Sequence, residues 1–128
     1  MLLPFHLLAG QRKNNSIILK PGESHTVAPM TLHGFFNPTE KEIKFNVRLS
    51  PGHTGFENSL RIIYGLASDG LTDKNTIPKS IKHTAIIVCM SDMNLPGLFT
   101  ILFPVLKFIA KRAKTNGEEQ KLIDKYCV

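Results

Sequence analysis

Residues 42–49, Glu-Ile-Lys-Phe-Asn-Val-Arg-Leu, alternate polar and apolar side chains along their whole length. Successive side chains of a β-strand point to opposite faces of the sheet, so this alternation predicts a strand that is buried on one side. Four apolar side chains would then face the protein interior, those of Ile43, Phe45, Val47 and Leu49. The segment therefore predicts that the first part of the chain folds as a β-sheet.

Shorter strands are expected before this segment, each bounded by turn residues. Asn14-Asn15 and Pro21-Gly22 are turn signals, because asparagine and glycine tolerate the backbone angles that tight turns require. The apolar segment 1–9, kept extended by Pro4, could act as an added or exchanged strand. The predicted short strands are residues 16–19, 23–28 and 32–36.

Beyond residue 52 the apolar residues recur at helical spacing. A first helix would end at Asp69-Gly70, since glycine suits the left-handed position after a helix. Pro78 would open a second helix, and Pro96 a third that is kinked at Pro104 and reaches about Lys114. A terminal turn or two would follow in residues 118–126. The apolar sides would hold Phe56, Leu60, Ile63, Tyr64 and Ala67 in the first helix, and Ile81, Ala85, Val88 and Cys89 in the second.

We therefore expect a β portion in residues 1–52 and a helical extension in residues 53–128, packed together as one structural unit. The chain has 128 residues, which is the size of one domain. The uncharged run 93–106 is shorter than the roughly 20 residues of a membrane-spanning helix. We expect it to pack in the core or at a subunit contact. A helix lying at a membrane surface, with the basic residues of segment 107–114 at the lipid headgroups, is the less favoured alternative.

Charge and cysteine content limit the partners and the compartment. The net charge is +6, but the 16 Lys and Arg residues are spread along the chain, so no nucleic-acid partner is expected. Cys89 and Cys127 lie in no paired metal-binding or disulfide spacing, which favours reduced thiols in a cytoplasmic protein. The start of the chain lacks the basic residues that precede a secretion signal.

One segment carries a family resemblance. Residues 22–37, Gly-Glu-Ser-His-Thr-Val-Ala-Pro-Met-Thr-Leu-His-Gly-Phe-Phe-Asn, resemble the second conserved motif of the cupin superfamily, with Gly22, His33 and Asn37 at the motif positions. The helical part resembles the tail of some small cupin-domain proteins, so the likeness covers about residues 16–114. It implies an α+β fold, a cupin-like antiparallel β-barrel or half-barrel (jelly roll) followed by a C-terminal helical segment.

The same resemblance implies a metal site, but most of the ligands of that site are absent from this sequence. The first cupin motif, which supplies two histidines and a glutamate, is absent, and Ala28-Pro29-Met30 stands where the second motif has Pro-x-Gly. His33 is the one ligand that the motif provides, and His25 would join it, because it shares a strand face with Val27. The ion would be divalent: Fe, Mn, Zn or Ni. Since one imidazole leaves an ion mostly hydrated, a hydrogen-bonded pocket histidine is the favoured interpretation of His33.

Three functions remain open. The favoured hypothesis is small-molecule binding in a β-barrel pocket lined by His25, Val27, His33, Phe35, Phe45 and Val47. The first alternative is a metal-dependent cupin enzyme, a dioxygenase or isomerase, in which His33 holds the metal. The second is a dimerisation or assembly module. A homodimer is expected in any case, because unpaired strand edges must be covered by another copy, by the helical tail, or by both.

Overall fold

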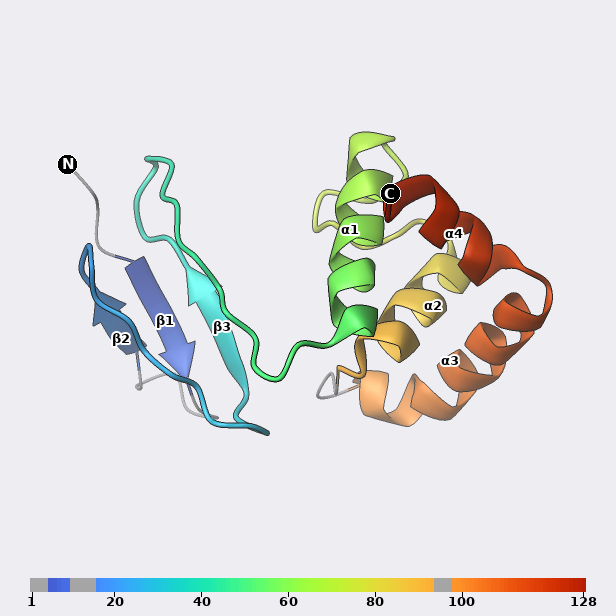
Figure 1. Cartoon of the computed structure of the whole chain (residues 1–128), viewed down its shortest axis with the longest axis horizontal. Coiled ribbons are helices and arrows are strands. Elements are labelled where there is room, and N and C mark those ends of the chain that lie inside the picture. Colours follow the sequence, from blue (N-terminus) through green and yellow to red (C-terminus); the bar gives the residue numbers. More distant parts are fainter. Residues whose placement is uncertain (1–4, 10–15, 94–97) are drawn as a thin grey trace. The chain divides into compact units, whose positions relative to one another are not determined.

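The structure is a computed structural model that describes residues 5–9, 16–93 and 98–128; of residues 5–9, 98 and 99 it describes the backbone only. The chain divides into two compact units, Met1–Arg48 and Leu49–Val128. We call them the β unit and the helical unit. The β unit contains the described strands of the sheet, and the helical unit contains the helices (Figure 1).

The sheet of the β unit has the N-terminal segment at its centre. Its strands are β1 (Phe5–Ala9), β2 (Ser16–Leu19) and β3 (His33–Phe36), in the spatial order β2-β1-β3. Both neighbours run antiparallel to β1, with Phe5 opposite Leu19 and Ala9 opposite His33. The apolar segment expected as an added or exchanged strand is therefore the central strand of its own sheet (Figure 1).

The predicted cupin-like barrel, half-barrel or jelly roll is wrong. The described strands form one open, three-stranded sheet of four- and five-residue strands. Residues 42–49 and 23–28 have no regular secondary structure, although both alternate in sequence. Phe45 is 45% exposed and Val47 62%. Alternation stabilises a strand only where a neighbouring strand pairs with it and another layer covers its apolar face, and neither condition holds for these segments in the described structure.

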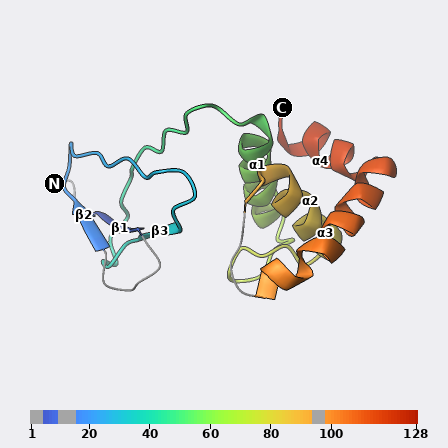
Figure 2. The ribbon, with the colours of Figure 1, turned by 90° about the horizontal axis from the view of Figure 1, so that it is seen from below.

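The three predicted helices are confirmed with bounds within a few residues of those expected, and the predicted terminal turn or two is a nine-residue helix. The helices are α1 (Thr54–Ser68), α2 (Ile81–Ser91), α3 (Leu98–Thr115) and α4 (Glu118–Tyr126). Helix α1 begins after His53, whose Nδ1 accepts a hydrogen bond from the backbone N–H of Phe56 at 2.8 Å. Helix α2 lies between α1 and α3, and α4 packs against both α1 and α3 (Figures 1 and 2).

The core of the helical unit forms around α2. Four consecutive α2 residues are buried, because this helix packs against neighbours on two sides: Ala85, Ile86, Ile87 and Val88. One cluster joins α2 to α1 and α4 through Ile62, Leu66 and Leu122, among others. A second joins α2 to α3 through Leu106 and Ala110.

The buried face of α1 differs from the predicted apolar stripe. Ser59, Ile62 and Leu66 are buried, whereas Tyr64 is 67% exposed. The hydroxyl of Ser59 donates a hydrogen bond to the carbonyl of Phe56, so this small polar side chain is satisfied inside the core. Among the described helices, none is long and apolar enough to cross a lipid bilayer.

Candidate functional site

Three of the predicted pocket residues lie side by side in the β unit. His33 and Phe35 belong to β3 and are two positions apart, so their side chains leave the same face of the strand. Their ring centroids are 5.9 Å apart in an edge-to-face arrangement. Phe45, which comes from the irregular segment after β3, brings its ring centroid to 5.0 Å from that of Phe35. We call His33, Phe35 and Phe45 the aromatic row.

The aromatic row is accessible and carries one polar group. Phe35 is 49% exposed and Phe45 45%, and His33 is also exposed. Nδ1 of His33 lies 2.8 Å from the carbonyl oxygen of Thr31. A carbonyl oxygen only accepts, so Nδ1 is the donor in this bond, and in the neutral ring Nε2 is then the acceptor. The row therefore offers two apolar rings and one imidazole nitrogen to a bound molecule.

The other predicted pocket residues are placed differently. His25 is exposed and lies in the irregular segment before β3, Val27 is half-buried, and Val47 is largely exposed. Within the part of the chain that the structure describes, ring contacts link His33 to Phe35 and Phe35 to Phe45, and none extends to His25. The described site is thus a row on one surface.

The metal site suggested for His33 and His25 is not formed by the described residues. No group of three or more His, Cys, Asp or Glu side chains among them could hold an ion. Asn37, the other polar residue of the motif, stabilises its own turn: its Oδ1 accepts from the backbone N–H of Thr39 at 3.0 Å, and its Nδ2 donates to the carbonyl of Lys41 at 2.8 Å. The described side chains therefore offer a divalent metal fewer than three such ligands at any one place, and so few ligands hold it weakly.

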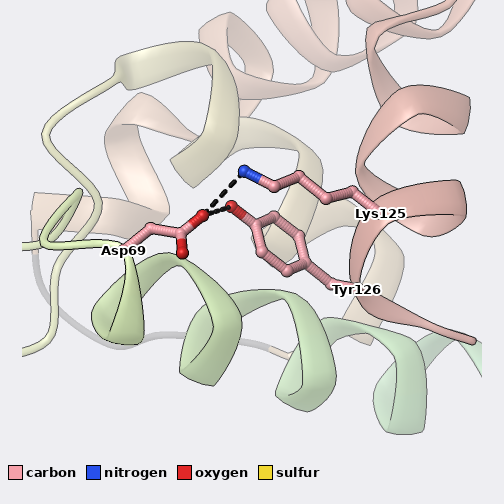
Figure 3. Close-up of polar contacts among 3 residues, drawn as sticks. All are labelled: Asp69, Lys125 and Tyr126. Carbon is pink, nitrogen blue, oxygen red and sulfur yellow. Dashed lines mark hydrogen bonds and ion pairs between the residues drawn. The ribbon is translucent and has the colours of Figure 1, made fainter.

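A polar cluster in the helical unit was not predicted (Figure 3). Oδ2 of Asp69, the residue that ends α1, lies 2.7 Å from Nζ of Lys125 and accepts a 2.7 Å hydrogen bond from the hydroxyl of Tyr126. These bonds, first that of Lys125, lower the pKa of Asp69 below its usual 3.8, and the bond to Asp69 raises the pKa of Lys125. Both α4 side chains bond to the same carboxylate oxygen, so the cluster fastens α4 to the end of α1.

The sequence contains no signal for this cluster, because 56 residues separate Asp69 from Lys125. The sequence predicts only that the first helix ends at Asp69-Gly70, and Asp69 does occupy the position at the C-terminus of α1. Its bonds to Lys125 and Tyr126 depend on α4 packing against α1, and no local spacing in the sequence indicates that contact.

The two thiols are free and are not activated. Burial raises the pKa of Cys89, and Lys107 only partly opposes this effect. Burial also raises the pKa of Cys127, whose Sγ lies 3.7 Å from the carbonyl oxygen of Asn58. A thiolate is the nucleophilic form, so neither residue resembles a catalytic cysteine.

A shallow hollow lies between α2 and the C-terminal half of α3. Its volume is about 260 Å³, and it is lined by Ile81 and Ile109 together with Lys82, Arg112 and Glu118. Ligand pockets are typically larger, about 300 to 1,000 Å³. Charges of both signs stand at its rim, so it selects neither an anion nor a cation.

Comparisons of the chain with protein-family models, with curated proteins and with solved structures find no match.

Proposed function

We propose that the β unit binds a small planar or aromatic molecule at the aromatic row. The observation that supports this proposal is the contact of three rings from two chain segments, each ring exposed to solvent. Aromatic pairs contribute about 0.5 to 1.5 kcal/mol beyond the burial of their area, so a ligand ring stacked on this row would gain from both effects.

The imidazole of His33 would orient the ligand. Its Nδ1 is engaged by Thr31, so Nε2 is the atom available to a hydroxyl or amide group of the ligand. One oriented hydrogen bond beside two apolar rings is an arrangement suited to recognition. We propose binding without catalysis, because no second titratable group accompanies His33 in the row.

NMR on the whole chain tests this proposal. The chain has no tryptophan, and its two tyrosines, Tyr64 and Tyr126, lie in the helical unit, so ring resonances report on the β unit better than intrinsic fluorescence does. A set of small aromatic alcohols and amides should shift the resonances of His33, Phe35 and Phe45 in common. We expect Phe35→Ala to weaken binding about tenfold, the loss of one ring contact plus burial.

Phe36→Ala is the matched control. Phe36 lies in the same strand and is 53% exposed, but its side chain leaves the opposite face from that of Phe35. The proposal is wrong if Phe36→Ala weakens binding as much as Phe35→Ala does, or if no compound in the set shifts the three resonances.

A second candidate function, homodimer assembly through the β unit, is favoured by a separate observation. No side chain in residues 16–48 is fully buried, and Ile18 is 53% exposed, Leu32 45% and Val47 62%. A small sheet gains independent stability by covering an apolar face, and in the described structure β2 and β3 each pair only with β1. We propose that a second copy pairs with the edge at β2, the strand that carries Ile18, and covers the exposed side chains.

Sedimentation equilibrium tests the dimer. We expect a dimer for the wild-type chain and a monomer for Ile18→Lys, because a lysine on an edge strand opposes edge-to-edge pairing. Tyr64→Lys changes a side chain of the helical unit that is 67% exposed, against 53% for Ile18, and should remain dimeric. A monomeric wild-type chain at high concentration would exclude this function.

A further inference from the structure

Helix α3 has an apolar face that the fold leaves uncovered. Ile101, Val105 and Phe108 follow one another at spacings of four and three residues, so they form one stripe along the helix. They are 75%, 55% and 66% exposed, respectively. The opposite face of α3 packs into the core through Leu106, Ala110 and Ala113. We call Ile101, Val105 and Phe108 the α3 stripe.

The α3 stripe is not explained by the packing of the helical unit. Core packing was expected for the uncharged run 93–106, and Leu106, which is 3% exposed, fulfils that expectation. Residues 94–97 of this run lie outside the described structure. Ile101 and Val105, in contrast, are largely exposed and belong to neither core cluster of the helical unit.

The same helix carries a concentrated positive charge. Lys107, Lys111, Arg112 and Lys114 fall within its last nine residues, and the sequence has no acidic residue between Asp92 and Glu118. Lys114 forms a 3.6 Å ion pair with Glu119, and Lys107 lies 4.8 Å from the ring centroid of Phe103. Lys111 and Arg112 have no ion pair among the described residues. Arg112 comes four residues after Phe108, so it continues the line of the α3 stripe.

We propose that α3 docks the protein onto an anionic lipid surface. The α3 stripe would enter the boundary between headgroups and acyl chains, and Lys111 and Arg112 would contact the lipid phosphates. An exposed apolar stripe that contains a phenylalanine, next to basic side chains on one helix, is the pattern of a helix that lies in the plane of a membrane interface. Each basic residue near an anionic leaflet adds to the attraction.

The charge of α3 favours a lipid surface over a second copy of the chain as the partner of the α3 stripe. Two copies packed through the α3 stripe would bring two sets of unpaired Lys and Arg side chains together, with a net charge of +6 on each chain. Like charges at close range oppose such a contact, whereas an anionic lipid surface complements them. This proposal concerns the helical unit alone and does not depend on the aromatic row.

Vesicle flotation of the whole chain tests the proposal. We expect the wild-type protein to float with vesicles of phosphatidylcholine that contain roughly one quarter phosphatidylserine, and not with phosphatidylcholine alone. Binding should fall several-fold at about 0.5 M NaCl, because salt screens the attraction. The double variant Ile101→Ser/Phe108→Ser should lose binding, and Lys111→Gln/Arg112→Gln should weaken it at least several-fold.

Two matched controls keep the test specific. Tyr64→Ser removes an aromatic side chain of α1 that is 67% exposed, and Lys41→Gln/Lys74→Gln removes two exposed charges that lie outside α3 and outside the hollow that Arg112 lines. Both should bind vesicles as the wild type does, and circular dichroism of each variant is the check that it is folded. The proposal is overturned if folded wild-type protein does not bind anionic vesicles, or if the controls lose as much binding as the α3 variants. It is also overturned if Ile101→Ser/Phe108→Ser converts a dimer into a monomer without changing flotation.

Discussion

The ring of Tyr126 lies directly against the backbone of Gly65. A methyl group added at Gly65 would overlap the Cδ1, Cε1 and Cγ atoms of that ring. The hydroxyl of the same tyrosine donates its hydrogen bond to Asp69, one turn further along the chain. Helix α4 therefore contacts α1 at a position where α1 has no side chain, and it is fastened there by a polar group at the end of α1 (Figure 3).

Gly65→Ala should destabilise the helical unit. Alanine favours a helix interior by up to about 1 kcal/mol over glycine, but overpacking costs about 1 to 3 kcal/mol. We expect a net loss of about 1 to 2 kcal/mol in the free energy of unfolding, measured by urea denaturation. In the double variant Gly65→Ala/Tyr126→Ala the two effects should not add, because the ring that obstructs the methyl group is gone. A stable Gly65→Ala protein would contradict this packing.

The ion pair of Asp69 and Lys125 should give stability a defined pH window. The pKa of Asp69 is lowered, so its contribution is present above the usual carboxyl pKa and is lost as the pH falls through the folded value. The pKa of Lys125 is raised, so its contribution is present below the usual amine pKa and is lost as the pH rises through the folded value. Both contributions are therefore complete between about pH 5 and pH 9.

Asp69→Asn tests this window through the melting temperature. Both side chains are largely exposed, so we expect a lowering of only a few degrees at neutral pH. The difference from the wild type should disappear at strongly acid pH, where the wild-type carboxylate is protonated, and should shrink as salt is added. The melting temperature of Lys125→Met should likewise lie below that of the wild type at neutral pH. This difference should disappear at strongly alkaline pH, where the wild-type amine is uncharged. A difference that is constant from acid to alkaline pH would show that the pair does not titrate as described.

The helices could be predicted because their signals are local. Apolar spacing, Gly70 and Gly117 with positive φ, and the break after α3 define where the helices lie and end. Which face of α1 is buried was predicted wrongly, since the buried position Ser59 is polar and Tyr126 arrives from a distant helix. Helix periodicity predicts the spacing of the buried residues, but the helices that pack against α1 determine which of its faces is buried.

The sheet could be predicted only where strands have partners. Segment 16–19 pairs with the N-terminal strand β1 and is a strand as predicted, whereas segment 42–49 has the cleaner alternation and no strand partner among the described residues. In the candidate site, the shared face of His33 and Phe35 follows from their spacing. The contact between the rings of Phe35 and Phe45 requires the segment after β3 to fold back alongside that strand, and no local sequence pattern predicts this.

The cysteines should react slowly with alkylating reagents at neutral pH. Burial raises the pKa of both Cys89 and Cys127, so the thiolate fraction at pH 7 is smaller than in an unstructured peptide. We expect iodoacetamide to label both more slowly than it labels the urea-unfolded chain, with the rise of the rate with pH displaced to higher pH than in the unfolded chain. Mass spectrometry of the peptides separates the two sites. Labelling of either residue at the unfolded rate at pH 7 would contradict the structure.

Core truncations should separate the two units of the chain energetically. Leu66 is 0% exposed and lies in the main cluster of the helical unit, whereas Val47 is 62% exposed in the β unit. Leu66→Ala should lower the free energy of unfolding by about 2 to 5 kcal/mol, because it removes buried methyl groups and leaves a cavity. Val47→Ala should change it by less than about 0.5 kcal/mol in the monomer, as surface substitutions do. Urea unfolding of Leu66→Ala is followed by circular dichroism at 222 nm, which reports mainly on the helices, and that of Val47→Ala by the NMR ring resonances of the β unit. If Val47→Ala costs as much as Leu66→Ala under conditions where sedimentation finds a monomer, the β unit has a core of its own that includes Val47. In that case the apolar side chains of the β unit are not exposed, and the proposal that they form a homodimer contact is refuted.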